Sequence, residues 1–417
     1  MRQGVDWLKL DNAGIIFPST STRRKTDVFR FSCQLHEEVD PALLQQALDG
    51  AVREFPHFLC VLRRGLFWYY LESSELRPRV APTDWRACAP LWSPNRRSLL
   101  FSLTYYKKRV SLEVYHVLAD GTGAIHFFKA ILRHYLLLRH FDTLGGQAPA
   151  LDYRAPFDER TEDGFRKHYR RIRAPKSDLP RHPWRLRGPR GAEYQLIEGA
   201  VSCAEALQLA RRHGTSLTVL LTAVLIEAIH DQMPRNQSTR PIVVTIPVNL
   251  RKHFPSETAR NFFGIVRVAY RFGQGEDTLD CIIDAVDKGL KEELREEKLA
   301  RRIGALMALE RNPVIKIIPL FLKNPVLRLS KWISDRGSTM TLSNVGAISL
   351  PPDLQSYVDL FSVYSSTGGM QVCVCSTGDR LTCGFASLFN GTELQRSFFS
   401  RLAGLGLSPV IYTNIEE

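Results

Sequence analysis

The stretch Leu112-Glu-Val-Tyr-His116-Val-Leu-Ala-Asp120-Gly121-Thr-Gly123 carries the most information about the fold of this chain. It reads as a β-strand that ends at His116, a short turn, and a helix with periodicity from about 123 to 138. A histidine at a strand end has a fixed backbone and, with an ordinary pKa near 6.5, takes up a proton at neutral pH. Asp120 would hold the loop, and Gly121 would allow a backbone conformation that other residues avoid. His116 is therefore a candidate general base, with a purely structural histidine as the alternative.

Outward from this stretch, strand and helix signals alternate in two similar rounds. In the first round we expect a strand at 28–35, a helix that begins at Pro41 with Asp40 as its N-cap, and two hairpins at 59–71 and 99–115. In the second round, Ser202 and Ser216 are the expected N-caps of two helices, and a charged helix is expected at 278–302. Strands are expected at 242–248, 265–272, 339–342, 358–364, 371–375 and 381–385. This alternation predicts an α/β protein with two similar halves.

The composition agrees with a folded chain of this kind. At 417 residues the chain is long enough for two packed domains. Its 44% apolar and 24% charged residues are ordinary for a soluble globular protein and exclude disordered, collagen-like and coiled-coil classes. The 56 basic against 43 acidic residues leave a net charge of +13, a surplus that favours an anionic partner.

Most of this surplus lies in one Pro-rich stretch, 166–191, between the two rounds. It contains ten Lys or Arg residues and one acidic residue, so it supplies +9 of the +13. Three interpretations remain open: a nucleic-acid arm, a solvated linker, or an electrostatic rim for a phosphate-bearing cofactor. No helix-turn-helix, zinc-finger or RNA-recognition signature supports the first.

Cysteine, histidine and membrane signals are weak. The eight cysteines form no C-x-x-C pair, and Cys373 and Cys375 fall on one face of an expected strand, which is more typical of buried small side chains than of a metal site. His126 and His134 fall on one face of the helix that follows His116, and we expect no metal there. The N-terminus lacks the apolar core of a signal peptide, and charges and prolines interrupt 314–329. We therefore expect a reduced, soluble, cytoplasmic protein.

The His116-Val-Leu-Ala-Asp120-Gly121 stretch resembles the H-x-x-x-D-G motif of the chloramphenicol acetyltransferase-like superfamily. This group includes BAHD acyltransferases, alcohol acetyltransferases, mycobacterial polyketide-associated acyltransferases, carnitine acyltransferases and nonribosomal peptide condensation domains. Two further stretches resemble family segments in the same order: Ile246-Pro-Val-Asn-Leu-Arg251 followed by Asn261-Phe-Phe-Gly264, and Thr341-Leu-Ser-Asn-Val-Gly346. The likeness spans nearly the whole chain and is nearest to bacterial alcohol-acetyltransferase-like and stand-alone condensation-like proteins.

The resemblance implies a fold and a division of the chain. The fold is two similar mixed-sheet αβ sandwich halves that meet at a central tunnel. The first half, 1–165, carries the H-x-x-x-D-G motif, 166–191 is the basic crossover, and 192–417 carries the other two motifs. Two departures matter. Tyr115 stands where many relatives have a second histidine, and no D-F-G-W-G box is present near the C-terminus, which argues against a plant-type BAHD enzyme.

The resemblance also implies a reaction. An acyl group would move from a thioester to an alcohol or amine, with His116 as general base and Ser343 as a candidate oxyanion donor. Asp120 and Arg251 would form a buried structural ion pair that sets the His116 loop. The same resemblance implies that Tyr115, Asn261 and Asn344 bind substrate.

The donor and the partners are left as alternatives. The donor would be an acyl-CoA or an acyl-phosphopantetheine on an acyl or peptidyl carrier protein, which would have to arrive in trans. We expect no permanently bound cofactor, no nucleic acid partner and no metal. We also expect a monomer. Three functions remain as alternatives. The chain is an acyltransferase acting on a small acceptor, a stand-alone condensation enzyme that forms an amide, or a non-catalytic binding protein of the same fold. The intact His116, Asp120, Gly121 and Arg251 argue against the third.

Overall fold

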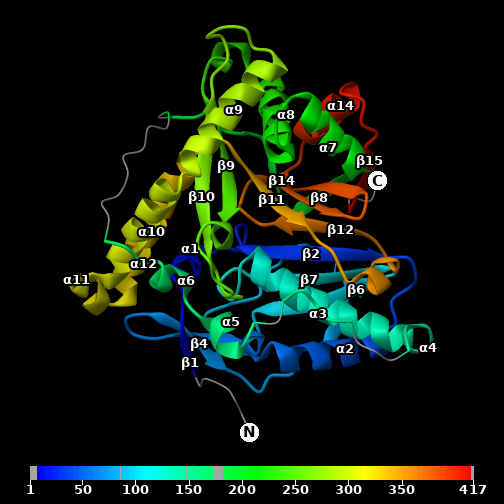
Figure 1. Ribbon diagram of the computed structural model, residues 1–417. Helices are drawn as coiled ribbons and strands as arrows, with labels where there is room; N and C mark the ends of the chain where they lie inside the picture. The colour runs from blue at the N-terminus through cyan, green and yellow to red at the C-terminus, as the bar shows by residue number, and fades with distance from the viewer. Residues whose placement is uncertain are drawn as a thin grey trace.

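The structure is a computed structural model that describes residues 7–84, 86–145, 149–153, 155–171, 180 and 182–414. Two mixed β-sheets, each with its own helices, form its two lobes (Figure 1). A third, small sheet lies beside the N-terminal lobe and has the order β1-β4-β3. Its strands are β1 (Trp7–Lys9), β3 (Cys60–Arg64) and β4 (Tyr69–Ser73).

The N-terminal lobe is built on a five-stranded sheet of order β12-β2-β7-β6-β5. Its strands are β2 (Val28–Leu35), β5 (Val80–Pro82), β6 (Phe101–Tyr106), β7 (Arg109–Tyr115) and β12 (Val358–Ser365). Two long helices, α2 (Pro41–Glu54) and α3 (Gly121–Arg139), pack against each other and cover this sheet. The helix α2 begins where expected, because the Asp40 side chain accepts hydrogen bonds from the backbone N–H groups of Ala42 and Leu43.

The C-terminal lobe is built on a seven-stranded sheet of order β10-β9-β11-β13-β14-β8-β15. Its strands are β8 (Arg190–Ser202), β9 (Ile242–Asn249), β10 (Phe263–Tyr270), β11 (Met340–Ala347), β13 (Met370–Thr377), β14 (Arg380–Phe389) and β15 (Val410–Thr413). Its helices are α7 (Cys203–Arg212), α8 (Leu217–Asp231), α9 (Leu279–Glu293) and α14 (Glu393–Gly404). The helix α8 is buried along nearly its whole length, as its almost continuous apolar sequence predicts.

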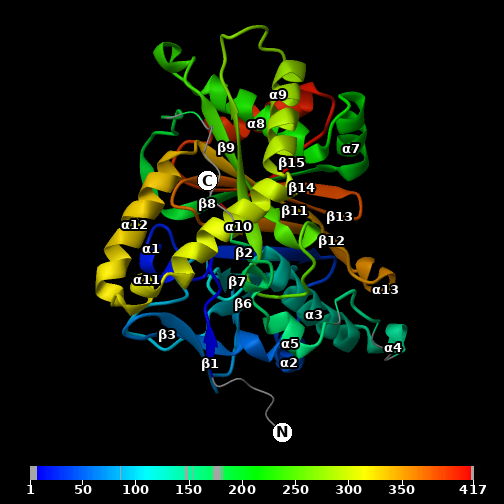
Figure 2. The same cartoon turned by 60° about the vertical axis from the view of Figure 1, so that its left-hand side comes forward.

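Shorter elements and one further pair of long helices complete the molecule. Among these, α10 (Glu296–Arg311) and α12 (Leu320–Arg336) run along one outer edge, joined by α11 (Pro313–Ile317), as Figure 2 shows. The remaining helices are α1 (Phe17–Thr20), α4 (Phe141–Leu144), α5 (Phe157–Thr161), α6 (Gly164–Lys167), α13 (Pro352–Gln355), and the 3-10 turns η1 (Pro56–Phe58), η2 (Arg235–Gln237) and η3 (Leu250–Lys252).

One strand joins the lobes. Strand β12 comes from the second round of the sequence, yet it pairs antiparallel with β2 at the edge of the N-terminal sheet. It also packs on β13 and β14 of the other sheet, and its Phe361 and Val363 lie in the N-terminal hydrophobic core. A buried ion pair adds to this connection: Arg109 on β7 donates to Glu198 on β8 at 2.8 Å, and the Tyr364 hydroxyl donates to the same carboxylate.

The α/β fold class with two mixed-sheet lobes is confirmed, whereas the central tunnel stays a prediction. Several elements differ from expectation. The strand β8 and the helix α12, which continues through Pro325, were not predicted. The expected helix at 278–302 is two helices that break at Leu294 and Arg295. Of the basic stretch 166–191, Arg173, Lys176 and Arg181 fall outside the described residues.

The described residues hold no metal cluster and no spanning helix. No three His, Cys, Asp or Glu side chains in them gather as a metal site would require. Cys373 and Cys375 are free and buried, and burial raises the pKa of the Cys373 thiol to about 12. No single described helix is long and apolar enough to cross a membrane. The bent pair α7–α8 passes by length and composition only, and α8 is a core helix.

Candidate active site

His116 lies directly after the last residue of β7, where its backbone N–H donates to the Asp27 carbonyl at 3.0 Å. Three aromatic rings surround its imidazole. Phe17 of α1 stacks on it at 4.8 Å between ring centroids, Phe29 of β2 meets it edge-on at 5.0 Å, and Phe263 of β10 lies tilted at 5.2 Å. The site therefore collects residues from both lobes around one histidine.

Asn261 fixes the tautomer of His116. The Asn261 Nδ2 donates to the His116 carbonyl at 2.9 Å and to Asp11 Oδ2 at 3.1 Å, so its Oδ1 is the atom 3.0 Å from His116 Nδ1. An amide oxygen only accepts, so Nδ1 must carry the proton. The lone pair of the imidazole is then on Nε2, which is the arrangement a general base needs.

Burial keeps this imidazole neutral. Removal from water lowers the pKa of His116 below its ordinary value, and this effect outweighs the opposing influence of the Asp120 charge, the Asn261 hydrogen bond and the Asp27 charge. A histidine with a lowered pKa is unprotonated at neutral pH. His116 is thus ready to accept a proton in the pH range where the cell operates.

Asp120 and Arg251 form the ion pair that the resemblance to the family motifs implied. Arg251 Nη1 donates to Asp120 Oδ2 at 2.8 Å, and both side chains are almost fully buried. The same carboxylate caps α3 by accepting from the Gly123 N–H at 3.0 Å, and it accepts from the Phe262 N–H at 2.9 Å. One buried group therefore joins the start of α3 to the segment that carries Asn261.

Gly121 does not adopt the special backbone conformation expected of it, and the close contact that requires a glycine lies at Gly123. Gly121 is the first residue of α3 and is not among the glycines with positive φ, and a Cβ there would meet only Phe31 at an ordinary 3.8 Å. A Cβ at Gly123 would lie 1.7 Å from the carbonyl oxygen of Ala259, which is backbone and cannot move aside. Gly123, two residues after the motif, must be a glycine because the two lobes touch backbone to backbone at this point.

Two of the residues implied to bind substrate make their polar contacts within the protein. Tyr115 is buried, stacks on Trp92, and its hydroxyl lies 3.0 Å from Ser21 Oγ. Asn261 is fully buried, and both ends of its amide are occupied by His116 and Asp11. Both side chains are therefore engaged by other groups of the protein, and a role for them in substrate binding stays a prediction.

The strand β11 carries Ser343 and Asn344, and the hydrogen bonds of the described residues join neither of them to His116. The Asn344 Nδ2 donates to Thr218 Oγ1 at 2.7 Å, and its Oδ1 accepts from the Gly346 N–H at 2.9 Å. Gly346 has φ +88°, and the register of β11 with β13 shifts at this point. Asn344 therefore builds a bulge within β11, and Ser343 is a half-buried residue just before it.

Sequence reasoning missed Asp11. Its Oδ1 accepts from the Gly14 N–H at 2.7 Å, its Oδ2 holds Asn261, and burial raises its pKa to about 6. The Asp11-Asn-Ala-Gly14 stretch is a recognisable turn signal, but nothing local indicates that the turn touches residue 261. The aromatic wall around His116 was missed for the same reason.

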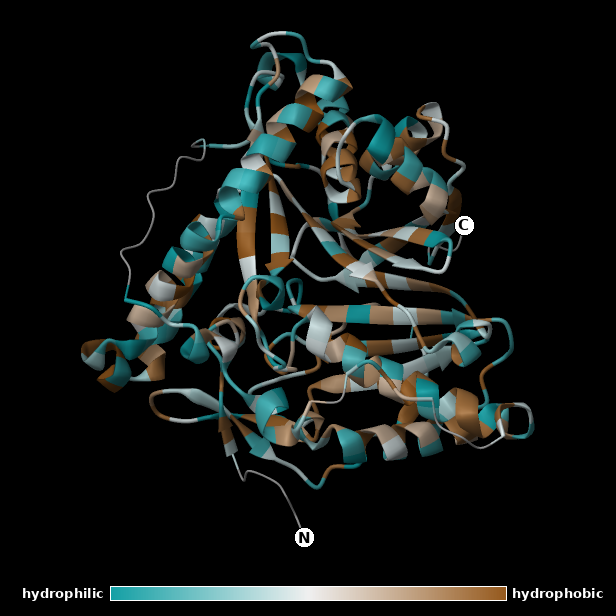
Figure 3. Cartoon of the chain, in the orientation of Figure 1, coloured by the Kyte–Doolittle hydropathy of each residue, from teal (hydrophilic) through white to brown (hydrophobic). Residues whose placement is uncertain are grey.

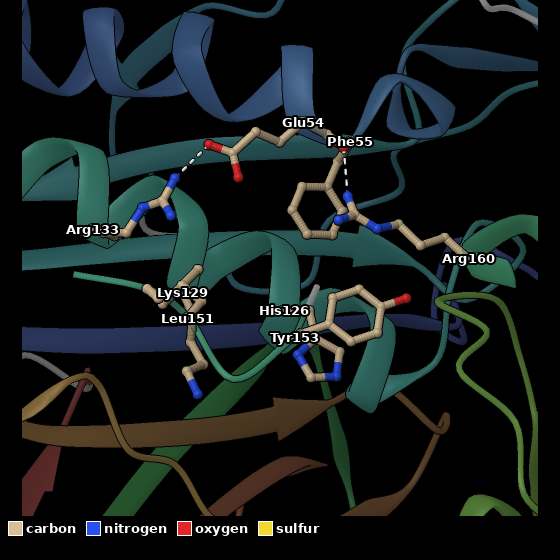
Figure 4. Close-up of a pocket in the computed structure, with 9 residues that line it drawn as sticks. Glu54, Phe55, His126, Lys129, Arg133, Leu151, Tyr153 and Arg160 are labelled. Atoms are coloured by element: carbon tan, nitrogen blue, oxygen red, sulfur yellow. Dashed lines mark hydrogen bonds and ion pairs between the residues drawn. The ribbon is translucent and has the colours of Figure 1, made fainter. Parts of the chain in front are cut away.

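Two cavities lie apart from these residues. The first, of about 320 Å³, lies between α2, α3 and residues 150–160 (Figure 4). Its charges are already paired, because Arg133 contacts Glu54 at 2.5 Å and Arg160 donates to the Glu54 carbonyl at 2.7 Å. His126 stacks on Tyr153 here, whereas His134 faces Glu54, so the two histidines do not converge on one point.

The second cavity, of about 530 Å³, is strongly basic. Its lining includes no acidic residue and five arginines: Arg185, Arg187, Arg190, Arg240 and Arg336. Three of them belong to the basic stretch 166–191. A series of hydrogen bonds between neighbouring segments connects this cavity with His116. Arg190 donates to the Gly368 carbonyl at 3.2 Å, nearby Ser366 donates to Val28 at 2.9 Å, and the preceding Asp27 carbonyl binds the His116 N–H.

Comparisons by sequence gave nothing: no protein-family model matches, and no curated protein is significantly similar. Solved structures share the fold. The first condensation domain of the CDA synthetase superposes with a TM-score of 0.63 at 15% identity, covering 97% of each chain. The TRI3 trichothecene 15-O-acetyltransferase from Fusarium sporotrichioides gives 0.60 at 11% identity and 97% coverage of each chain. F. sporotrichioides TRI101, solved with coenzyme A and T-2, gives 0.60 at 11% identity, covering 98% of this chain and 100% of that one.

Proposed function

From the fold that this chain shares with a peptide-synthetase condensation domain and an acetyltransferase, we propose that it is an acyltransferase that uses His116 as its general base. One observation carries the proposal. The imidazole is buried and neutral, and Asn261 holds the proton on Nδ1, so that Nε2 is the free base. A histidine that only filled space would not need a fixed tautomer, a lowered pKa and a wall from both lobes together.

The reaction proposed is direct transfer from a thioester to an alcohol or amine. The Nε2 atom removes the proton of the acceptor as the acceptor oxygen or nitrogen attacks the thioester carbonyl. The tetrahedral intermediate then collapses, the carbon–sulfur bond breaks, and the imidazolium returns the proton to the leaving thiolate. No acyl-enzyme forms, because holding both substrates beside one base supplies the proximity. The base contributes about 10²–10⁴ in rate.

The oxyanion of the intermediate needs a donor, and Ser343 is the candidate by resemblance. Asn344 fixes the bulge that follows it, so the two residues would act as a donor and its support. Asn261 is a positioning residue in this scheme, since its amide is fully used in holding His116 and Asp11.

The arginine cavity supports a phosphate-bearing donor. Five guanidinium groups with no acidic neighbour in the lining form a site that favours a polyanion. The 3′-phosphate and pyrophosphate of coenzyme A fit this requirement, and so does the phosphopantetheine arm of an acidic carrier protein. We propose an acyl-CoA as the donor, because a free CoA carries three phosphates and the five arginines of the cavity lining can face them.

The test is incubation of the purified protein with a panel of acyl-CoAs and mixed alcohols and amines, with thiol release and product masses as readouts. His116→Ala should abolish transfer while the protein stays folded. His126→Ala is the matched control, since this histidine lies on the same helix that follows the motif but in another cavity, and it should keep parental turnover.

Each alternative function gives a different result. Transfer only from a loaded carrier protein would identify a condensation enzyme in place of a CoA-dependent one. Retained transfer in a folded His116→Ala protein would overturn the general-base assignment. Tight binding of acyl-CoA without turnover for any acceptor would favour the non-catalytic binding protein.

A further inference from the structure

The segment from α11 to α12 exposes an unusual amount of apolar surface. Of the twenty-one exposed large apolar residues in the described chain, eight lie here, and each is more than half exposed. They are Val314, Ile317, Phe321, Leu322, Val326, Leu329, Trp332 and Ile333. Their spacing of three and four residues places those of α12 on one outer stripe of the helix. In Figure 3, apolar (brown) stretches of this segment lie at the outer edge of the molecule.

The same helix is polar on its inner side. Lys323 is buried, with its Nζ donating to the Phe67 carbonyl at 3.0 Å and lying 3.5 Å above the Trp68 ring. Asn324 accepts from Ser19 at 2.8 Å, and Asp335 accepts from Lys25. A soluble helix normally has the reverse arrangement, with its apolar stripe on the protein and its charges in water. The outward stripe is therefore not a by-product of packing.

The charges around the stripe select an occupant. The segment 313–336 contains five basic residues and one acidic residue, which gives a net charge of +4, and the whole chain carries +13. Lys316 and Arg336 are exposed along the stripe, and Arg328 is exposed at its border, on the side that meets α1. Arg336 lies 3.5 Å above the Trp332 ring. A stripe of Phe, Leu and Trp flanked by cations is the pattern of a helix that lies in the surface of an anionic membrane.

The shape of the segment agrees with lying on a membrane and not crossing one. Pro313, Pro319 and Pro325 and the five cations divide it, so it cannot form an unbroken apolar span. In Figures 1 and 2 the segment projects along an outer edge, so that a flat surface can reach its whole length. We propose that the α11–α12 stripe binds the protein to the surface of an anionic lipid bilayer.

This surface lies next to the candidate active site. The inner side of α12 holds α1 through the Ser19–Asn324 and Ser19–Arg328 hydrogen bonds, and α1 carries Phe17, which stacks on His116. Arg336 at the end of α12 lines the arginine cavity. A bilayer on the stripe would therefore place apolar, membrane-dissolved molecules beside His116. Binding itself does not depend on acyl transfer, so either proposal can fail alone.

Vesicle co-sedimentation of the full chain tests the inference. The probes are vesicles of phosphatidylcholine alone and of phosphatidylcholine with 30% phosphatidylglycerol (about a third anionic lipid, to give a surface potential in the range that binds basic helices). We expect binding to the anionic vesicles only, weakened by salt. The variant Val326→Glu/Leu329→Glu should lose at least about tenfold in binding, since two charges would replace apolar groups that enter the bilayer in the bound state.

The control is Leu138→Glu/Phe141→Glu, which changes two exposed apolar residues at α3 and α4, at the other end of the molecule. It should bind vesicles like the parent, and both variants should melt like the parent because the changed side chains are exposed. Equal binding by parent and stripe variant, or no binding of the parent to anionic vesicles, would overturn the proposal. So would a parent that sediments as a dimer and a stripe variant that sediments as a monomer, because the stripe would then face a second copy.

Discussion

At the scale of single residues, neighbouring side chains fix the tautomer and the orientation of the His116 imidazole. Asn261 sets which ring nitrogen is protonated, and Asp11 sets which way the Asn261 amide points. The hydroxyl or amine of an acceptor would meet a base whose orientation is decided before substrate arrives. Two predictions concern this group of three residues.

The first prediction is a pH profile. Because burial lowers the pKa of His116, its neutral form persists below the ordinary value of 6.5. The acid limb of kcat/KM should therefore have an apparent pKa below 6.5, with full activity above it and loss of activity as the pH falls. The free energy of unfolding should also decrease as the pH falls, since the unfolded histidine binds a proton more readily than the folded one. An acid limb at or above 6.5, measured with the best donor, would contradict this assignment.

The second prediction concerns Asn261→Ala. Loss of the amide leaves the imidazole free to rotate and to adopt both tautomers, so kcat should fall by about a hundredfold while the KM for the acceptor changes little. Nitrogen-15 NMR of the His116 ring should show one tautomer in the parent and a mixture in the variant. A single unchanged tautomer together with lowered kcat would mean that Asn261 acts in some other way.

At the scale of elements, two caps separate local from tertiary stabilisation. Asp40 and Asp120 both cap long helices of the N-terminal lobe, but only Asp120 also pairs with Arg251. Asp40→Ala should lose about 1 kcal/mol of unfolding free energy, the usual value of a cap. Asp120→Ala should lose about 3–5 kcal/mol because Arg251 is left buried and unpaired. Chemical denaturation of both variants checks this; equal losses would mean that the ion pair contributes nothing.

Gly121 and Gly123 give a second matched pair. Gly121→Ala should be tolerated, since its Cβ would have an ordinary contact and alanine favours a helix. Gly123→Ala should destabilise the protein strongly, because its Cβ would overlap the Ala259 backbone and force α3 away from the other lobe. Melting temperatures and thiol-release assays of the two variants are the measurement. A Gly123→Ala protein that melts and turns over like Gly121→Ala would disprove the close approach.

Elements also show what a sequence can predict. The caps at Asp40, Ser202 and Ser216 were predicted correctly because a cap involves residues two or three positions apart. The strand β8 was not, since its polar and glycine residues break the apolar alternation, and its strand form depends on pairing with β14 and β15. In the site, the Asp120–Arg251 pair came from a resemblance. The Asp11–Asn261 contact joins residues 250 positions apart and has no local signal.

At the scale of the whole molecule, the excess charge has a location. Neutralising Arg185 and Arg187 together (Arg185→Gln/Arg187→Gln) should raise the KM for acyl-CoA several-fold with kcat nearly unchanged, the pattern of lost uniform binding. That KM should also rise with ionic strength in the parent. The double variant Arg170→Gln/Arg171→Gln removes the same charge from the same basic stretch but outside the cavity lining, and it should behave like the parent. Equal effects from both pairs would mean that only the overall charge matters.

The exchange of β12 between lobes has a consequence for how the protein is made. On the ribosome β2 emerges early, but its edge partner β12 is translated only after most of the chain, including four of the seven strands of the second sheet. Until then the nascent first lobe carries an open, apolar strand edge, which invites pairing with other chains. Productive synthesis would therefore depend on chaperones that shield this edge, and a fragment ending before β12 would aggregate although it contains His116.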